Sequence, residues 1–306
     1  MIEYNRNSWW KTAFSIRGTI LPQVAGRVAE MTLWSVLIVS LYHRGETLGW
    51  IHLESLAGLD PVIHTLLGSM LGFLIVFRMN ASNNRYWEGR SHWGMLINNT
   101  RSLVRYGAAH SPRARELADL VAGYVLCLKQ SQRNNRDLTE AAIHLPPDVL
   151  EDANHFGNPP TAVAAAISDW IAARQREGQL ADLDVRHMED LLAALVNAQG
   201  GCEKIQKTPL PFVYASMIKQ LILVYISTLP LVLVEDHGWW TPLFVATVAI
   251  GFFGIEEASV ETEDPFGLEE NCLDLEAYCL TIIRDTAQIA ARAEARGLAD
   301  SQKALI

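Results

Sequence analysis

The stretch that decides the fold is PVIHTLLGSMLGFLIVFRMNASNNRYWEGR, residues 61–90. Its first 17 residues, Pro61 to Phe77, contain no Asp, Glu, Lys or Arg. The polar part that begins at Arg78 continues without a proline. The apolar run is slightly shorter than the ~20 residues that cross a bilayer comfortably. The pattern predicts one helix that begins in a membrane and continues into water.

Three further runs have the same apolar character. One such run alone would more often be a buried core helix, but four runs in two pairs predict membrane helices. Trp239 and Trp240 suit the interface between membrane and water. No stretch shows the alternation of a strand, so the predicted fold class is all-α: a polytopic membrane protein with four transmembrane helices and a helical cytoplasmic domain. The three runs are residues 28–43, 220–234 and 237–255.

Basic residues are distributed unevenly along the chain. The loops 45–60 and 235–236 contain no Lys or Arg, whereas residues 78–219 contain sixteen. Because basic residues accumulate on the cytoplasmic side, we expect residues 78–219 and both termini in the cytoplasm. The predicted division is an N-terminal segment 1–27, membrane helices one and two in 28–77, the cytoplasmic domain 78–219, membrane helices three and four in 220–255, and a C-terminal segment 256–306.

The cytoplasmic domain reads as helices joined by turns. Ser111-Pro112 predicts the start of a helix that ends near Gln132. Residues 138–160 contain two Pro-Pro pairs and predict a loop with one short helical turn. Thr161 is the predicted cap of a helix that stops at Gly178. Asp182 or Asp184 is the predicted cap of a third helix, which we expect to end at Gly200-Gly201.

The net charge lies in one segment. The chain has 25 Lys and Arg against 34 Asp and Glu, a formal charge of −9, which argues against a nucleic-acid partner. Residues 256–276 hold nine acids and no Lys or Arg, so this segment carries the whole excess. It is either a solvated acidic turn or a cation-binding or gating element, since neighbouring carboxylates repel one another unless something offsets them.

Catalytic, metal and cofactor signals are weak. The nine His show no His-x-x-x-His spacing, and the four Cys include no Cys-x-x-Cys pair. We therefore predict neither an enzyme nor a bound metal or cofactor. His64 lies inside an apolar run, where it is either a titratable group in a pore or a hydrogen-bond partner of a neighbouring helix.

Ser69, Phe73 and Phe77 recur at a spacing of four and therefore share one helix face. Copies of this helix around an axis would form aromatic rings, and a narrow apolar ring can gate a channel by dewetting. The alternative interpretation from spacing alone is ordinary core packing.

Several motifs resemble the bestrophin family, in its bacterial branch. The most extensive is FRMNASNNRYWEGR, residues 77–90, followed by Trp93-Gly94. The sequence TPLPF at 208–212, with Tyr214, and EDPFG at 263–267, with Asn271, also resemble the family. Trp9-Trp10 and RGTILP at 17–22 fit at the N-terminus. The motifs fall in the family's order, and the apolar runs lie where its four membrane helices should.

The resemblance implies a homopentameric ion channel in the bacterial inner membrane. Its neck would be lined by Ser69, Phe73 and Phe77, with Ser69 in place of the family's larger apolar residue. A cytoplasmic aperture would lie at Leu210. The acidic segment corresponds to the calcium clasp of eukaryotic relatives, but Cys272 replaces its last carboxylate. Only Glu269 and Glu270 remain as candidates for weak cation binding.

The implied function is the passage of small monovalent ions, chloride and other anions first. The implied partners are further copies of the chain, the lipid bilayer and the permeant ions. Two alternatives stay open: a monovalent cation channel of the same fold, and a membrane-anchored helical scaffold that conducts no ions.

Overall fold

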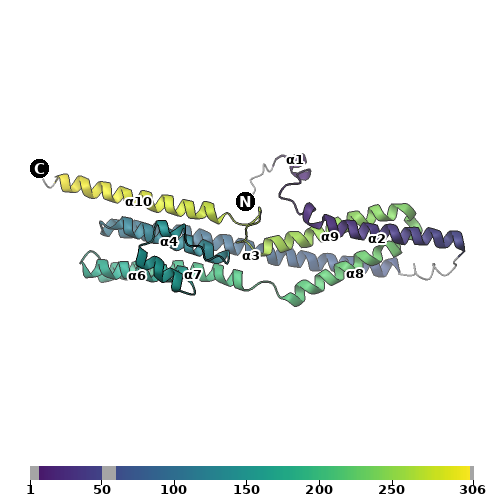
Figure 1. Ribbon diagram of the computed structural model, residues 1–306, viewed down its shortest axis with the longest axis horizontal. Helices are drawn as coiled ribbons and strands as arrows, with labels where there is room; N and C mark the ends of the chain where they lie inside the picture. The colour runs from purple at the N-terminus through teal and green to yellow at the C-terminus, as the bar shows by residue number, and fades with distance from the viewer. Residues whose placement is uncertain (1–6, 50–59, 304–306) are drawn as a thin grey trace. The chain divides into compact units, whose positions relative to one another are not determined.

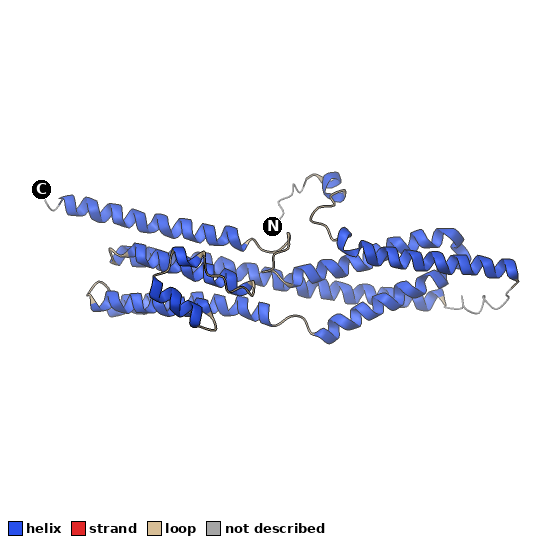
Figure 2. Ribbon diagram, in the orientation of Figure 1, coloured by secondary structure: helices blue, strands red, loops and turns tan. Residues whose placement is uncertain are grey.

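The computed structural model describes residues 7–49 and 60–303, and across these two ranges it contains helices and turns but no strand (Figure 2). The predicted all-α class is confirmed. The chain divides into two compact units. The first contains the chain up to Tyr86, together with Pro209–Asp264 and Glu269–Asn271; the second contains Trp87–Thr208, Pro265–Leu268 and the chain from Cys272 onward.

The first unit consists of long apolar helices (Figure 1). Helix α2 packs along α9 and α8, and α8 packs along α9. Their core includes Leu71, Ile75, Ile222 and Val245, all 2% exposed or less. The helices are α1 (Trp9–Ala13), α2 (Leu21–Leu48), the first part of α3 (Pro61–His110), α8 (Phe212–His237), η3 (Gly238–Trp240) and α9 (Thr241–Glu263).

The four predicted apolar runs lie on α2, α3, α8 and α9. Within residues 7–49 and 60–303, three helical stretches are long and apolar enough to cross a membrane: Leu21–Leu48, Pro61–His110 and Phe212–Glu263. The last contains both α8 and α9, joined by the short helix η3. Helix α2 continues past Arg44, and residues 50–59 of the predicted loop 45–60 lie outside the described part of the chain.

The unbroken helix predicted from residue 61 onward is present as α3, Pro61–His110. At its start the carboxylate of Asp60 accepts the Val62 N–H at 2.8 Å. The glycine at position 89 of this helix permits close packing. A Cβ at Gly89 would lie 3.0 Å from the Phe266 ring, within the second unit.

The second unit is a helical bundle centred on α4 (Ala114–Gln132), which is buried over most of its length. Helix α4 packs against α6 (Pro159–Arg176) and α10 (Leu275–Lys303), and α6 packs against α7 (Asp182–Lys207). The short helices η2 (Ala141–Ile143) and α5 (Pro147–His155) complete it.

Several predicted helix boundaries in this unit are wrong, and proline explains two of them. The expected loop 138–160 contains η2 and α5, and α6 begins at Pro159 before Thr161. Both α5 and α6 begin with proline, whose fixed φ suits a first turn where its missing N–H is not needed. Helix α4 begins at Ala114 because the Ser111 hydroxyl accepts the Arg113 N–H, at 3.2 Å, in the preceding turn.

Helix α7 also differs from expectation at its end. It begins at Asp182, but the N-cap is Ala181 and not Asp182 or Asp184 as predicted. Asp184 lies in the first turn, where its carboxylate accepts the Ala181 N–H at 2.9 Å. The predicted end at Gly200-Gly201 is wrong, because α7 continues to Lys207. A Cβ at Gly201 would overlap the ring of His92. The glycine therefore allows a close approach between helices and does not end one.

We expect Gly201→Ala to destabilise the protein and Gly200→Ala to stabilise it. Alanine inside a helix is about 0.5–1 kcal/mol better than glycine, and the Gly200 position is open, with no atom within 4 Å of an added Cβ. At Gly201 the added methyl meets His92, and overpacking costs about 1–3 kcal/mol. Thermal unfolding followed by tryptophan fluorescence measures both. Equal midpoints for the two variants would contradict the close approach.

Candidate functional site

The three residues predicted to line a neck lie on an exposed face of α3. Phe73 is 68% exposed and Phe77 63% exposed, and Ser69 is also exposed, its hydroxyl donating to the Thr65 carbonyl at 2.9 Å. None of the three belongs to the core of the first unit. Two large aromatic side chains exposed on one apolar helix are expected to contact lipid, another copy of the chain or a pore.

This exposed face is longer than the three residues suggest. Successive positions 4, 3, 4, 4, 3 and 4 residues apart are all exposed, as a helix face with 3.6 residues per turn requires. The stripe changes from apolar to amide side chains after Phe77 and carries no formal charge. Its members, called here the α3 stripe, are Val62, Leu66, Ser69, Phe73, Phe77, Asn80 and Asn84. The sequence interpretation missed Val62, Leu66, Asn80 and Asn84, although the same spacing extended in both directions would have found them.

The opposite face of α3 is buried and holds the charge that follows Phe77. Arg78 is 2% exposed. Its Nη1 lies 3.1 Å from Oε1 of Glu256, and its Nη2 lies 3.7 Å from Oε2 of Glu263. Its Nε donates to the Ser259 hydroxyl at 3.2 Å. The guanidinium is therefore directed toward α9 and away from the α3 stripe.

Glu256 is the centre of a buried ion cluster. Its side chain is 2% exposed and lies within ion-pair distance of Arg78, of Lys219 on α8 at 3.5 Å, and of Arg27 on α2 at 3.7 Å. Arg27 also bonds Glu257 at 2.6 Å. Burying a charge is costly unless partners satisfy it, and here cations from three helices do so. We call Arg27, Arg78, Lys219, Glu256 and Glu263 the Arg78 cluster.

The predicted aperture residue, Leu210, is held through its backbone. The Leu210 N–H donates to Oε1 of Glu263 at 2.9 Å, and the side chain is half-buried. The Glu263 carbonyl in turn accepts the Nε–H of Arg85 at 3.1 Å. Glu263 thus joins the segment before α8 to two arginines of α3.

The acidic segment is mostly paired, so the description of a solvated turn is wrong for its first part. Besides Glu256, Glu257 and Glu263, the Glu261 carboxylate accepts the Asn271 amide at 3.0 Å. In the second unit Glu276 bonds the buried Lys129 at 2.7 Å. These contacts offset the repulsion between neighbouring carboxylates.

The two candidate cation ligands lie at the surface. Glu269 and Glu270 are exposed, and Glu270 accepts a hydrogen bond from Arg17 at 3.1 Å. Within residues 7–49 and 60–303, no group of three or more His, Cys, Asp or Glu is placed to hold a metal ion. Cys272, at the position of the family's last carboxylate, is buried.

The His and Cys residues that the sequence offers for chemistry have structural surroundings. Nε2 of His64 lies 3.2 Å from the Tyr225 carbonyl and 3.2 Å from the Thr228 hydroxyl, both on α8. This supports the interpretation of His64 as a partner of a neighbouring helix.

All four Cys are buried. Burial raises the pKa values of Cys127, Cys202 and Cys279 to about 12, so these thiols stay protonated.

These features define a helical membrane protein with an uncharged, exposed helix face backed by buried ion pairs. A family model described as bacterial/fungal bestrophin protein matches residues 1–288. The chain therefore belongs to the bestrophin family, which indicates a channel and not an enzyme.

The relatives and solved structures agree with this assignment. The chain is 33% identical to a voltage-dependent anion channel-forming protein of Nostoc, covering 92% of this chain and 91% of the relative. It is 29% identical to the voltage-dependent anion channel-forming protein YneE of Escherichia coli K12, covering 96% and 95%. The structure matches a bacterial bestrophin homologue of Klebsiella pneumoniae with a TM-score of 0.81 at 26% identity, covering 88% of this chain and 98% of that one.

Proposed function

We propose that the chain is one subunit of a homopentameric channel for small monovalent anions, chloride first, in the bacterial inner membrane. The observation that carries this proposal is the α3 stripe. Five copies of α3 around an axis would form a neck from Ser69, Phe73 and Phe77, with Leu66 and Val62 before it and Asn80 and Asn84 after it. Leu210 would form the aperture at the cytoplasmic end. The number of subunits rests on the family resemblance.

Three features support anions over cations. The stripe carries no carboxylate, and the positive edges of its Phe rings tolerate an anion better than their faces do. Asn80 and Asn84 add amide N–H donors, which an anion can accept. Several carboxylates of the acidic segment are occupied by Arg or Lys, which reduces their attraction for mobile cations. The relatives named as anion channels support the same choice.

The test is the reversal potential of the purified protein in a planar bilayer under a KCl gradient. We expect a value near the chloride equilibrium potential. A value near the potassium equilibrium potential would assign the chain to cation channels. A non-conducting scaffold would be favoured by three results together. The protein is a pentamer by native mass spectrometry, it passes no current, and it still passes none after Phe73 and Phe77 are replaced with alanine.

A further inference from the structure

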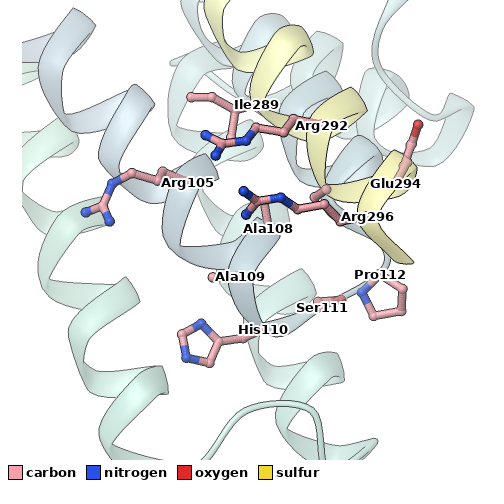
Figure 3. Close-up of a pocket in the computed structure, with 11 residues that line it drawn as sticks. Arg105, Ala108, Ala109, His110, Ser111, Pro112, Ile289, Arg292, Glu294 and Arg296 are labelled. Carbon is pink, nitrogen blue, oxygen red and sulfur yellow. The ribbon is translucent and has the colours of Figure 1, made fainter. Parts of the chain in front are cut away.

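A pocket of about 1000 Å³ lies in the second unit, where the end of α3 and the turn after it meet α10 (Figure 3). Arg105 and His110 line it from α3, and Ser111 lines it from the turn. Arg292, Glu294 and Arg296 line it from α10. Its volume is at the upper end of the range of small-ligand sites.

The charge of the pocket is opposite to that of the protein. Three guanidinium groups and one carboxylate line it, whereas the chain as a whole has a formal charge of −9. Among the side chains that the structure describes, those of residues 7–49 and 60–296, no carboxylate lies within ion-pair distance of Arg105, Arg292 or Arg296. The three guanidinium groups therefore have no acidic partner among those side chains, and they line a pocket that an anion could enter.

Arg101, one turn before Arg105, shows the contrast. Its Nη2 donates to the Asp285 carboxylate at 2.5 Å. Although partial burial raises the pKa of Asp285, hydrogen bonds from Arg101 and Arg284 hold that pKa below its ordinary value. Thus α3 and α10 pair their charges at Arg101 and Asp285, whereas Arg105, one turn later on α3, has no such partner among the described side chains.

The arginines of α10 are directed to one side. Arg292 and Arg296 are four residues apart and share a helix face, while Glu294 lies between them in sequence. Figure 3 shows their guanidinium groups extending from the same side of α10, and the Glu294 carboxylate extending from the other side. The carboxylate therefore does not occupy the position between the arginines.

We propose that this pocket binds a small molecule carrying two or more phosphate groups. Guanidinium groups bind phosphate oxygens bidentately, and three of them at one pocket favour a ligand with several negative charges over a single halide ion. The Ser111 hydroxyl lies at the same pocket as a further potential donor. The ligand would come from solution or be the phosphate headgroup of a lipid. Binding at this pocket goes beyond ion conduction and does not depend on it.

The experiment is calorimetric titration of the detergent-purified, full-length protein with inorganic pyrophosphate, in the absence of phospholipid. We expect Arg105→Gln, Arg292→Gln and Arg296→Gln each to weaken binding about tenfold, since a hydrogen bond to a charged group contributes about 1.4 kcal/mol or more. Arg292→Lys keeps the positive charge but cannot donate two parallel hydrogen bonds to one phosphate. Its affinity for pyrophosphate is therefore expected to lie between those of the wild type and Arg292→Gln.

The matched control is the triple variant Arg115→Gln/Arg176→Gln/Arg186→Gln, which removes three exposed arginines of the same unit outside the pocket. We expect it to bind pyrophosphate as the wild type does, while the pocket triple variant loses binding. Equal affinities of the two triple variants, or no binding by the wild type at millimolar pyrophosphate, would overturn the proposal. If the pocket triple variant does not fold, equal affinities of Arg292→Gln and the wild type would overturn it instead.

A second titration distinguishes the two sources of phosphate. Dioctanoylglycerol pyrophosphate, a soluble lipid whose headgroup carries two phosphate groups, is added as a competitor of pyrophosphate. Tighter binding of pyrophosphate, or no displacement by the lipid, assigns the pocket to a soluble phosphate compound. Tighter binding of the lipid, lost in the pocket triple variant, assigns it to a lipid headgroup.

Discussion

Replacing both Phe73 and Phe77 with alanine is expected to raise the single-channel conductance about tenfold or more. The two side chains are exposed on α3, so their removal creates little cavity in the core of the subunit. If they form the narrow apolar part of the pore, truncation widens it and removes a dewetting barrier. Each decrease of about 1.4 kcal/mol in that barrier raises the rate of ion passage about tenfold. Single-channel recording in symmetrical KCl measures the effect.

The control for this variant is Ile63→Ala, on the same helix and 66% exposed. At 100° per residue, Ile63 lies about 80° around α3 from Phe73, outside the stripe. Its truncation is expected to leave conductance unchanged. Unchanged conductance in the double variant would remove Phe73 and Phe77 from the neck. Equal increases in both variants would show a general loosening of the subunits.

The second large effect is expected on stability, from Arg78→Met. Breaking a buried ion pair by removing one partner costs about 3–5 kcal/mol, because the remaining charge is buried without compensation. Lys219 and Arg27 remain near Glu256 and offset part of this, so we expect about 3 kcal/mol. The midpoint of unfolding, measured in detergent, should fall accordingly. The double variant Arg78→Met/Glu256→Leu should recover part of the loss, since it leaves neither charge of the pair unpartnered.

Arg115→Met is the matched control for Arg78→Met. It breaks an exposed ion pair with Asp119, whose atoms are 3.2 Å apart, and such pairs contribute about 0–1 kcal/mol. We expect little change in its unfolding midpoint. If Arg78→Met is no more destabilising than this control, or if the double variant is worse than both of its single variants combined, the buried pair does not stabilise the first unit.

The elements that sequence predicted well are those with a long, uniform pattern. The apolar run of residues 61–77 and the polar helix after it appear as one helix, because no residue in that stretch opposes the helical backbone. The spacing of Phe73 and Phe77 also placed them correctly on a common face, and their exposure became visible only once Leu71 and Ile75 were seen to fill the core.

The errors came from residues with two possible roles. The pair Gly200-Gly201 is typical of a helix end, but Gly201 lies inside α7. The ring of His92 occupies the space that a side chain at position 201 would need, which accounts for the glycine. The prolines of 138–160 suggested a loop, but they begin helices. The acids of 256–276 were judged by their neighbours in sequence, where no Lys or Arg occurs. Their partners Arg78 and Arg27 are 178 and 229 residues before Glu256, and only folding brings these charges together.

The bond from the Leu210 N–H to Glu263 has a consequence for how such a protein can change over time. Since the carboxylate holds the main chain, any amino acid except proline can occupy position 210 and keep the anchor. The width of an opening at this position would then be set by one side chain alone. A lineage could exchange leucine for alanine, valine or methionine and alter the bore in single mutational steps, without passing through an intermediate in which the segment has lost its attachment.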